Sequence, residues 1–115
     1  MLIGQNKKIS LDKFIYKSLY DKDNGYYIKK NPFGKKGDFI TSPNISVLFS
    51  EMISIWLISF WENLKKPKKI NIIELGAGNG EMMSQIIKTL NNFSEINLSA
   101  NFLILEKSPL LIKIQ

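Results

Sequence analysis

Three glycines at alternate positions directly follow an apolar run rich in isoleucine, and no other feature of the sequence constrains the fold as strongly. The run occupies residues 70–75, and the glycines are Gly76, Gly78 and Gly80. Apolar residues then recur at helical spacing over residues 82–90. Because a continuous apolar run is typical of a buried parallel strand, we predict the order strand, glycine turn and helix.

A second apolar run completes this pattern at residues 101–105, after the turn-forming residues Asn91, Asn92 and Ser94. The order strand, helix and strand predicts an α/β fold with a parallel sheet. The carboxyl ends of parallel strands meet at one edge of such a sheet, where ligands commonly bind. We therefore expect Glu106, which follows the second run, to lie beside the glycine turn.

The first 66 residues predict a helical segment, with a domain boundary near Pro67. Apolar residues at helical spacing predict a short amphipathic helix over residues 10–21 and a long helix that begins at residue 44. The long helix should end before Pro67, because a proline ring disfavours helix at the preceding residue. The chain is thus divided into residues 1–66, which include the GDFITSP loop, and a strand-helix-strand unit at residues 67–115.

The stretch between the two helices contains several glycines and prolines and predicts an irregular, turn-rich segment. Residues 26–28 and 39–41 are its two short β-prone runs. On the long helix, the aromatic side chains follow a helical spacing and are expected in the core or on a packing face; they are Phe49, Trp56, Phe60 and Trp61. Met82 and Met83 are interpreted as core residues behind the glycine turn.

The residue types exclude several kinds of chemistry. The chain has no cysteine, histidine or arginine, which excludes a disulfide framework, a zinc finger, a thiol nucleophile, a histidine base and a Ser-His-Asp triad within it. We predict no metal site. The net charge of +6 comes from lysines scattered in pairs, so we expect no nucleic-acid partner, which would favour arginine and a clustered basic face.

The sequence also predicts no membrane span. Its most apolar stretch, residues 45–64, is interrupted by Glu51, Glu62 and several serines. The first ten residues show no targeting pattern, so we expect a cytoplasmic protein.

The glycine spacing and a neighbouring acid favour one class of cofactor. Dinucleotide sites use G-x-G-x-x-G, whereas here the spacing is G-x-G-x-G and Glu74 stands two residues before the first glycine. A carboxylate repels a pyrophosphate but attracts a cofactor that carries an ammonium and a sulfonium. We therefore expect S-adenosylmethionine, with Glu106 accepting hydrogen bonds from both ribose hydroxyls. The alternative is a tight turn without a ligand.

The sequence resembles the MidA-type class I methyltransferases over nearly its whole length. The most specific motif is GDFITSP at residues 37–43. Further resemblance lies in Gly25-Tyr26-Tyr27, Pro32-Phe33-Gly34, Phe49, Glu51, the turn at residues 74–80, residues 106–110 and Gln115. The resemblance implies the amino-terminal part of a Rossmann-like, doubly wound sheet, incomplete here. It follows that the apolar faces of the long helix and the strands would lack partners and that this piece would be inactive alone.

The resemblance also implies a function. Its mitochondrial relatives look like protein arginine methyltransferases that assist the assembly of respiratory complex I. A protein arginine would be the substrate, on a partner such as a respiratory-chain subunit, and the mitochondrial matrix becomes the alternative location. Two other hypotheses stay open: a non-catalytic assembly factor that keeps the fold, and a nicotinamide-dependent oxidoreductase, which the glycine spacing disfavours.

Residue by residue, the resemblance implies cofactor contacts at Glu74, Gly76, Ala77, Gly78 and Glu106.

The resemblance places three residues of the GDFITSP loop, Asp38, Thr41 and Ser42, near the substrate cleft. The alternative for them is a hydrogen-bonded turn that docks the helical segment on the sheet. Asp38 and Glu51 are the candidate catalytic carboxylates, and Glu51 has a solvated helix position as its alternative.

Overall fold

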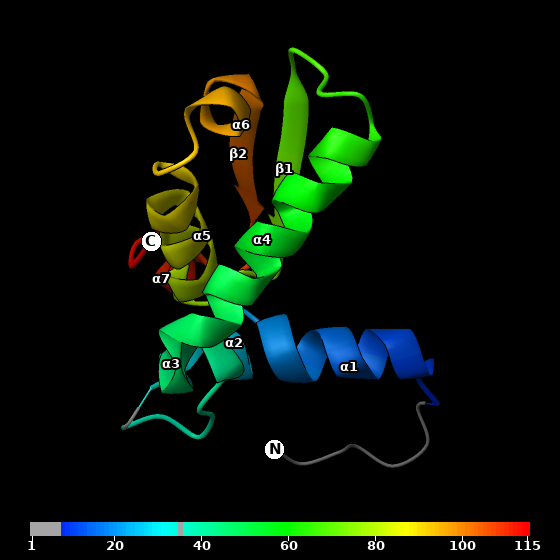
Figure 1. Ribbon diagram of the computed structural model, residues 1–115. Helices are drawn as coiled ribbons and strands as arrows, with labels where there is room; N and C mark the ends of the chain where they lie inside the picture. Colours follow the sequence, from blue (N-terminus) through cyan, green and yellow to red (C-terminus); the bar gives the residue numbers. More distant parts are fainter. Residues whose placement is uncertain (1–7, 35) are drawn as a thin grey trace.

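The computed structural model describes residues 8–34 and 36–115 and has an α/β architecture, which confirms the predicted fold class. Seven helices and two strands follow one another along these residues (Figure 1). The helices are α1 (Leu11–Tyr20), α2 (Tyr26–Lys29), α3 (Ser42–Ile45), α4 (Val47–Asn63), α5 (Glu81–Leu90), α6 (Ser94–Ser99) and α7 (Pro109–Ile112), and the strands are β1 (Ile70–Leu75) and β2 (Ala100–Leu105).

The two strands form a parallel sheet in which Ile70 pairs with Ala100 and Leu75 with Leu105. Helices α4 and α5 lie side by side in front of the strands and cover one face of this sheet (Figure 1). The core between them and the sheet contains Trp61, Ile72, Met83, Ile86, Leu90 and Ile96. Both predicted strands and the helix between them are thus confirmed.

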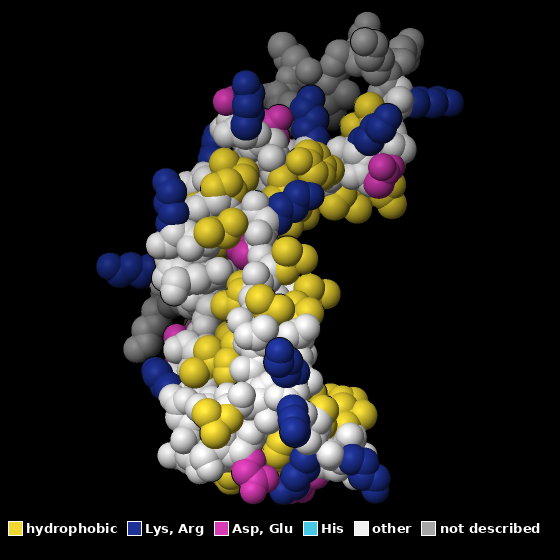
Figure 2. Space-filling view, turned by 90° about the horizontal axis from the view of Figure 1, so that it is seen from above, with side chains coloured by type: hydrophobic (Ala, Val, Ile, Leu, Met, Phe, Trp, Pro, Cys, Tyr) yellow, Lys and Arg dark blue, Asp and Glu magenta, His cyan; other side chains and the backbone are white. Residues whose placement is uncertain are grey.

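The other face of the sheet is open. Side chains alternate across a strand, and the alternate apolar residues on this face are exposed: Ile73, Leu75, Leu103 and Leu105. Strand β1 is therefore parallel as predicted but buried on one face only. Figure 2 shows hydrophobic side chains exposed among lysines along the visible face of the molecule.

The four aromatic residues predicted to pack on the long helix differ in their burial. Trp61 is buried and donates a hydrogen bond from Nε1 to the carbonyl oxygen of Pro67 at 3.0 Å, which ties the end of the helix to the entry of β1. Phe49, Trp56 and Phe60 are exposed. The prediction of a packed position is right for Trp61 and wrong for these three, because only one side of α4 meets α5 and the sheet.

The long helix is shorter than predicted at both ends. A separate short helix, α3, precedes it, and the Ser46 side chain caps α4 by accepting a hydrogen bond from the N–H of Leu48. Helix α4 ends at Asn63, and the backbone of Lys65 and Lys66 enters the left-handed region. The chain therefore leaves the helix through this turn before it reaches Pro67.

Residues 26–28, predicted as β-prone, form helix α2 instead. Gly25 packs against the backbone of Asp21, where an added Cβ would lie 2.5 Å from the Asp21 nitrogen. Because of this close turn, Tyr26 and Tyr27 lie against α1. Such tertiary contacts override a β preference. Of the second β-prone run, Phe39 forms a single bridge with Phe33. Helices α6 and α7 were not predicted.

The domain boundary near Pro67 stays a prediction. Helix α4, before that boundary, packs against α5, which lies after it. None of the helices in the described part of the chain is long and apolar enough to cross a membrane. Within the same residues, no three potential metal-ligating side chains come together.

Candidate functional site

The glycine turn joins β1 to α5 and holds three residues in the left-handed region, with φ of 70° at Gly76, 58° at Gly78 and 75° at Gly80. Side chains with a Cβ rarely adopt this conformation. A Cβ added at Gly76 would meet nothing within 4 Å, so open space lies directly against the backbone there. The turn thus offers a cradle that a side chain at Gly76 would fill.

Glu106 lies beside this turn, as the order of strands predicts. Its Oε2 accepts a hydrogen bond from the backbone N–H of Gly78 at 3.0 Å. Its Oε1 accepts from the N–H groups of Lys107 at 2.6 Å and Ser108 at 2.9 Å. A carboxylate has about four acceptor positions, so this arrangement leaves about one for a ligand. A second ribose hydroxyl would have to compete with one of the three N–H groups.

Glu74 lies on the face of β1 that α5 covers. Its Oε2 is buried and accepts no hydrogen bond from the described residues. Burial raises the pKa of Glu74 above its ordinary value of 4.5, and a hydrogen bond from the backbone of Met83 opposes part of this effect. A buried carboxylate oxygen without a hydrogen-bond partner suits a cationic ligand, which would relieve the cost of desolvation.

Two small cavities flank the turn, each of about 120 Å³. The first, here called the Glu74 cavity, is lined by Phe33, Thr41, Pro43, Glu74, Gly76, Ala77, Gly78, Asn79, Glu81 and Met82. The second, the Glu106 cavity, is lined by Tyr20, Tyr27, Phe33, Gly76, Glu106 and Leu111. Phe33 and Gly76 line both, so the two cavities meet at these residues.

The predicted cofactor residues are therefore brought together. Gly76, Ala77 and Gly78 line the Glu74 cavity with Glu74 itself, and Glu106 lines the second cavity.

Of the residues predicted near the substrate, Thr41 lines the Glu74 cavity. Asp38, Ser42 and Glu51 line neither cavity, and all three are exposed.

Asp38 is held by two donors from the helical segment. Its carboxylate pairs with Lys30 Nζ at 2.6 Å and accepts a hydrogen bond from the Tyr26 hydroxyl. The Lys30 ammonium and the Tyr26 hydroxyl lower the pKa of Asp38 below its ordinary value of 3.8. The hydrogen bond to Asp38 raises the pKa of Tyr26 to about 12. These contacts favour the turn-forming alternative for Asp38.

Two residues at the turn carried no predicted role at the site. The Phe33 ring lies against Gly78, and the Gln115 side chain donates a hydrogen bond from Nε2 to the Gly78 carbonyl oxygen at 2.8 Å. Phe33 and Gln115 both belong to the motifs that resemble the MidA-type family. This resemblance is the one feature of the sequence that could have pointed to them. Neither is near Gly78 in sequence, so spacing alone could not assign them.

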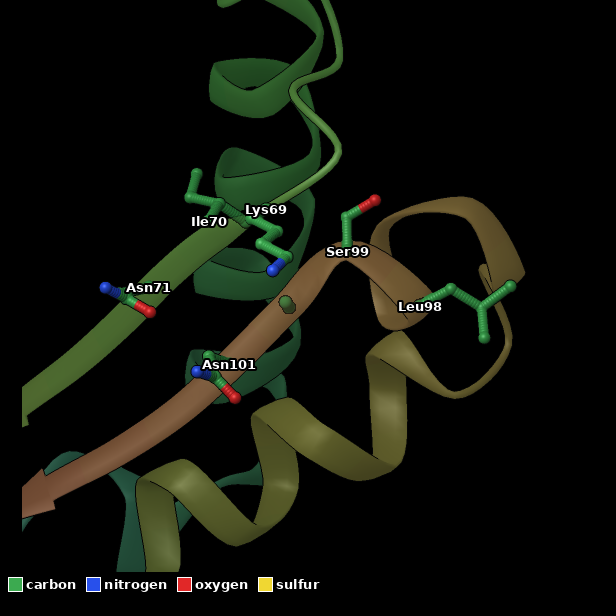
Figure 3. A pocket seen from close by; sticks show the side chains of 7 residues that line it. Lys69, Ile70, Asn71, Leu98, Ser99 and Asn101 are labelled. Carbon is green, nitrogen blue, oxygen red and sulfur yellow. The ribbon is translucent and has the colours of Figure 1, made fainter.

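A larger hollow, of about 440 Å³, lies at the opposite end of the sheet. Figure 3 shows Asn71 on β1 and Asn101 on β2 at its border, with Ser99 and Leu98 beside them. These residues lie towards the amino ends of the strands, whereas ligands of parallel sheets bind at the carboxyl ends. The glycine turn is therefore the candidate site.

A large part of the chain matches a model of a known protein family. A family model for S-adenosyl-L-methionine-dependent methyltransferases matches residues 52–115, a range that includes the glycine turn and both glutamates. The chain belongs to this family. This confirms the resemblance to the MidA-type methyltransferases and identifies S-adenosylmethionine as the cofactor of the family.

Relatives in animals match a longer part of the chain. It is 36% identical over 107 residues to the mitochondrial protein arginine methyltransferase NDUFAF7 homolog of Drosophila melanogaster. It is 33% identical over 109 residues to mitochondrial protein arginine methyltransferase NDUFAF7 of Homo sapiens, and 35% identical over 109 residues to that of Xenopus laevis. Each alignment covers 93% of this chain but only 24% or 25% of the relative. The chain thus spans about a quarter of their length.

The residues at the turn fit the cofactor of this family. The partnerless oxygen of Glu74 suits an ammonium, and the open space at Gly76 allows a ligand to approach the backbone. The acceptor position left on Glu106 suits a ribose hydroxyl.

Proposed function

We propose that the protein transfers the methyl group of S-adenosylmethionine to an arginine nitrogen of a protein substrate. The observation that carries the proposal is the position of Glu74 and Glu106, which lie in two adjoining cavities at one glycine turn. The names of the relatives, which are protein arginine methyltransferases, support the choice of substrate. We also propose that residues 67–115 begin a Rossmann-like, doubly wound sheet.

The residues of this chain would bind and orient the cofactor. Glu74 would hold the ammonium of the amino-acid portion, and Glu106 would accept a hydrogen bond from the ribose. Gly76, Ala77 and Gly78 would let the cofactor lie against the backbone. When bound, S-adenosylmethionine supplies an activated methyl group for an in-line displacement, whose rate depends on alignment with the nucleophile.

The 115 residues are proposed to be inactive by themselves. The chain spans about a quarter of its relatives, and the open face of the sheet exposes apolar side chains. A mostly parallel sheet is ordinarily covered on both faces. The active form would therefore contain further segments that cover this face and bind the substrate.

The partner of the protein and its location in the cell are also proposals. A respiratory-chain subunit would fit the complex I role suggested by the family resemblance. The word mitochondrial in the names of the relatives supports a mitochondrial location, for which we propose the matrix, and the cytoplasmic location stays a prediction.

Calorimetry on the longest form that the gene encodes tests this function. We expect S-adenosylmethionine to bind the wild type with micromolar affinity and the Glu106→Gln variant more weakly. Glu62→Gln is the matched control, because Glu62 is an exposed glutamate on α4 that lines neither cavity. A folded wild type without affinity for the cofactor would contradict the proposal and favour a non-catalytic assembly factor.

Substrate class is tested separately with the methyl-labelled cofactor. Arginine-containing peptides should accept the label, and the same peptides with lysine in place of arginine should not. If the protein binds the cofactor but labels neither peptide, the proposal of an arginine substrate is contradicted. The proposal that the protein binds S-adenosylmethionine is not affected.

A further inference from the structure

Phe33 borders both cavities of the candidate site, at the place where they meet. It lines both of them, and Gly76 is the other residue that does so. A Cβ added at Gly78 would lie 3.0 Å from Cε2 of this ring and 3.3 Å from Cδ2 and Cζ. Any ligand that extends from Glu74 to Glu106 must therefore pass the Phe33 ring.

The position of Phe33 is fixed by its own loop. The Gly34 N–H donates to the carbonyl oxygen of Phe39 at 3.0 Å, and the Phe39 N–H donates to that of Pro32 at 2.8 Å. The Phe33 N–H donates to Asn31 Oδ1 at 3.0 Å. These bonds hold the backbone on both sides of Phe33, so the ring is placed before a ligand arrives.

Neighbouring rings support the Phe33 side chain without enclosing it. Tyr27 stacks on it with centroids 6.4 Å apart and an angle of 19° between the planes. Phe39 lies at the same centroid distance, tilted by 42°. Phe33 nevertheless stays only half-buried, so part of its ring borders the cavities.

The order of the chemical groups in the cofactor then determines which part of the cofactor lies beside the Phe33 ring. In S-adenosylmethionine the sulfonium joins the amino-acid portion to the ribose. If Glu74 holds the ammonium and Glu106 holds the ribose, the group between them is the sulfonium. An aromatic ring attracts a cation through its negative face, and the attraction strengthens when water is excluded.

We infer that Phe33 is a cofactor-binding residue whose ring contacts the sulfonium and favours S-adenosylmethionine over its neutral product, S-adenosylhomocysteine. This inference rests on the proposed function and adds a residue that discriminates substrate cofactor from product. It assigns a binding role to the Pro32-Phe33-Gly34 motif, which lies outside the matched residues 52–115.

Calorimetry with both compounds tests the inference on the longest form that the gene encodes. In Phe33→Leu, the dissociation constant of S-adenosylmethionine should rise about tenfold, while that of S-adenosylhomocysteine should change less than about threefold. Phe60→Leu is the matched control, because Phe60 is an exposed phenylalanine that lines neither cavity. It should leave both constants unchanged.

A second variant distinguishes the effect of the negative face of the Phe33 ring from the effect of the ring's shape. Replacement of Phe33 by 3,4,5-trifluorophenylalanine keeps the size of the ring but weakens its negative face, so the fold should be retained. We expect the affinity for S-adenosylmethionine to fall and that for S-adenosylhomocysteine to stay the same. Equal losses for both compounds, or no loss for either, would overturn the inference while leaving the proposed function intact. A folded wild type that binds neither compound would overturn both.

Discussion

Glu106 Oε2 accepts a hydrogen bond at 3.0 Å from the backbone N–H of Gly78, a residue 28 positions earlier in the chain. The bond joins the end of β2 to the turn between β1 and α5. It forms because the strands are parallel and in register, so that their carboxyl ends meet at one edge. The acid is thereby positioned at the turn before any cofactor binds.

Replacement of Glu106 by glutamine should weaken both the turn and cofactor binding. A hydrogen bond to a charged group contributes about 1.5 to 3 kcal/mol, so we expect a loss of affinity for S-adenosylmethionine of about ten- to a hundredfold. The variant should also unfold at a lower urea concentration, because Gly78, Lys107 and Ser108 all donate to this carboxylate. Calorimetry and urea titration measure the two effects. Unchanged values in both would show that the carboxylate charge is unimportant here.

Glu74→Gln should stabilise the fold while it weakens cofactor binding. Burial raises the folded-state pKa of Glu74 above 4.5, so the folded protein binds this proton more tightly than the unfolded chain does. The stability contributed by the group is thus highest below pH 4.5 and is lost as the pH rises through the folded-state pKa. The variant should melt at a higher temperature than the wild type at pH 7, and the difference should shrink towards pH 4.

Cofactor binding should show the opposite dependence on pH. Protonation of Glu74 removes its attraction for an ammonium, so the affinity of the wild type for S-adenosylmethionine should fall as the pH drops through the raised pKa. The Glu74→Gln variant should bind weakly and lose this dependence, whereas Glu62→Gln should keep it. Parallel pH profiles for the wild type and Glu74→Gln would contradict a direct contact with the cofactor.

Two glycine substitutions should separate loss of binding from loss of folding. Gly76→Ala adds a Cβ in open space, so it should cost about 1 to 2 kcal/mol from the left-handed backbone and prevent close approach of the cofactor. Gly78→Ala adds the same strain and also presses on the Phe33 ring. We expect both to lose affinity, with the lower melting temperature in Gly78→Ala. Equal melting temperatures would show that the ring moves aside without cost.

Tyr26→Phe tests the role of Asp38. Loss of the hydroxyl removes one of the two groups that lower the pKa of Asp38, so this pKa should move back towards 3.8 while the Lys30 pair remains. Carboxyl chemical shifts followed by NMR across the acid range measure it. Because neither Tyr26 nor Asp38 lines the two cavities, the affinity for S-adenosylmethionine should stay the same. A clear loss of affinity would show that Asp38 contributes to the binding site.

The local pattern of the sequence was enough to predict several elements. The spacing of apolar residues predicts helix α1, both strands and α5. The three glycines predict the turn, because its backbone has positive φ at each of them. The position of Glu106 was predictable as well, because parallel strands in one unit bring their carboxyl ends together. The helix, the strands and the glycine turn depend on periodicity or on the conformation of single residues, whereas the position of Glu106 depends on the order of the strands.

Contacts between distant segments decided the rest. Helix α2 replaced a β-prone run because Gly25 packs on Asp21 and Tyr26 reaches Asp38. The separation of Trp61 from the exposed aromatic residues of α4 depends on which side of the helix meets α5 and the sheet. The sequence by itself determined the α/β order and the glycine turn, since these are local properties of the chain. Only the tertiary structure placed Phe33 at the border of both the Glu74 cavity and the Glu106 cavity, because that depends on how a loop far from the turn packs against it.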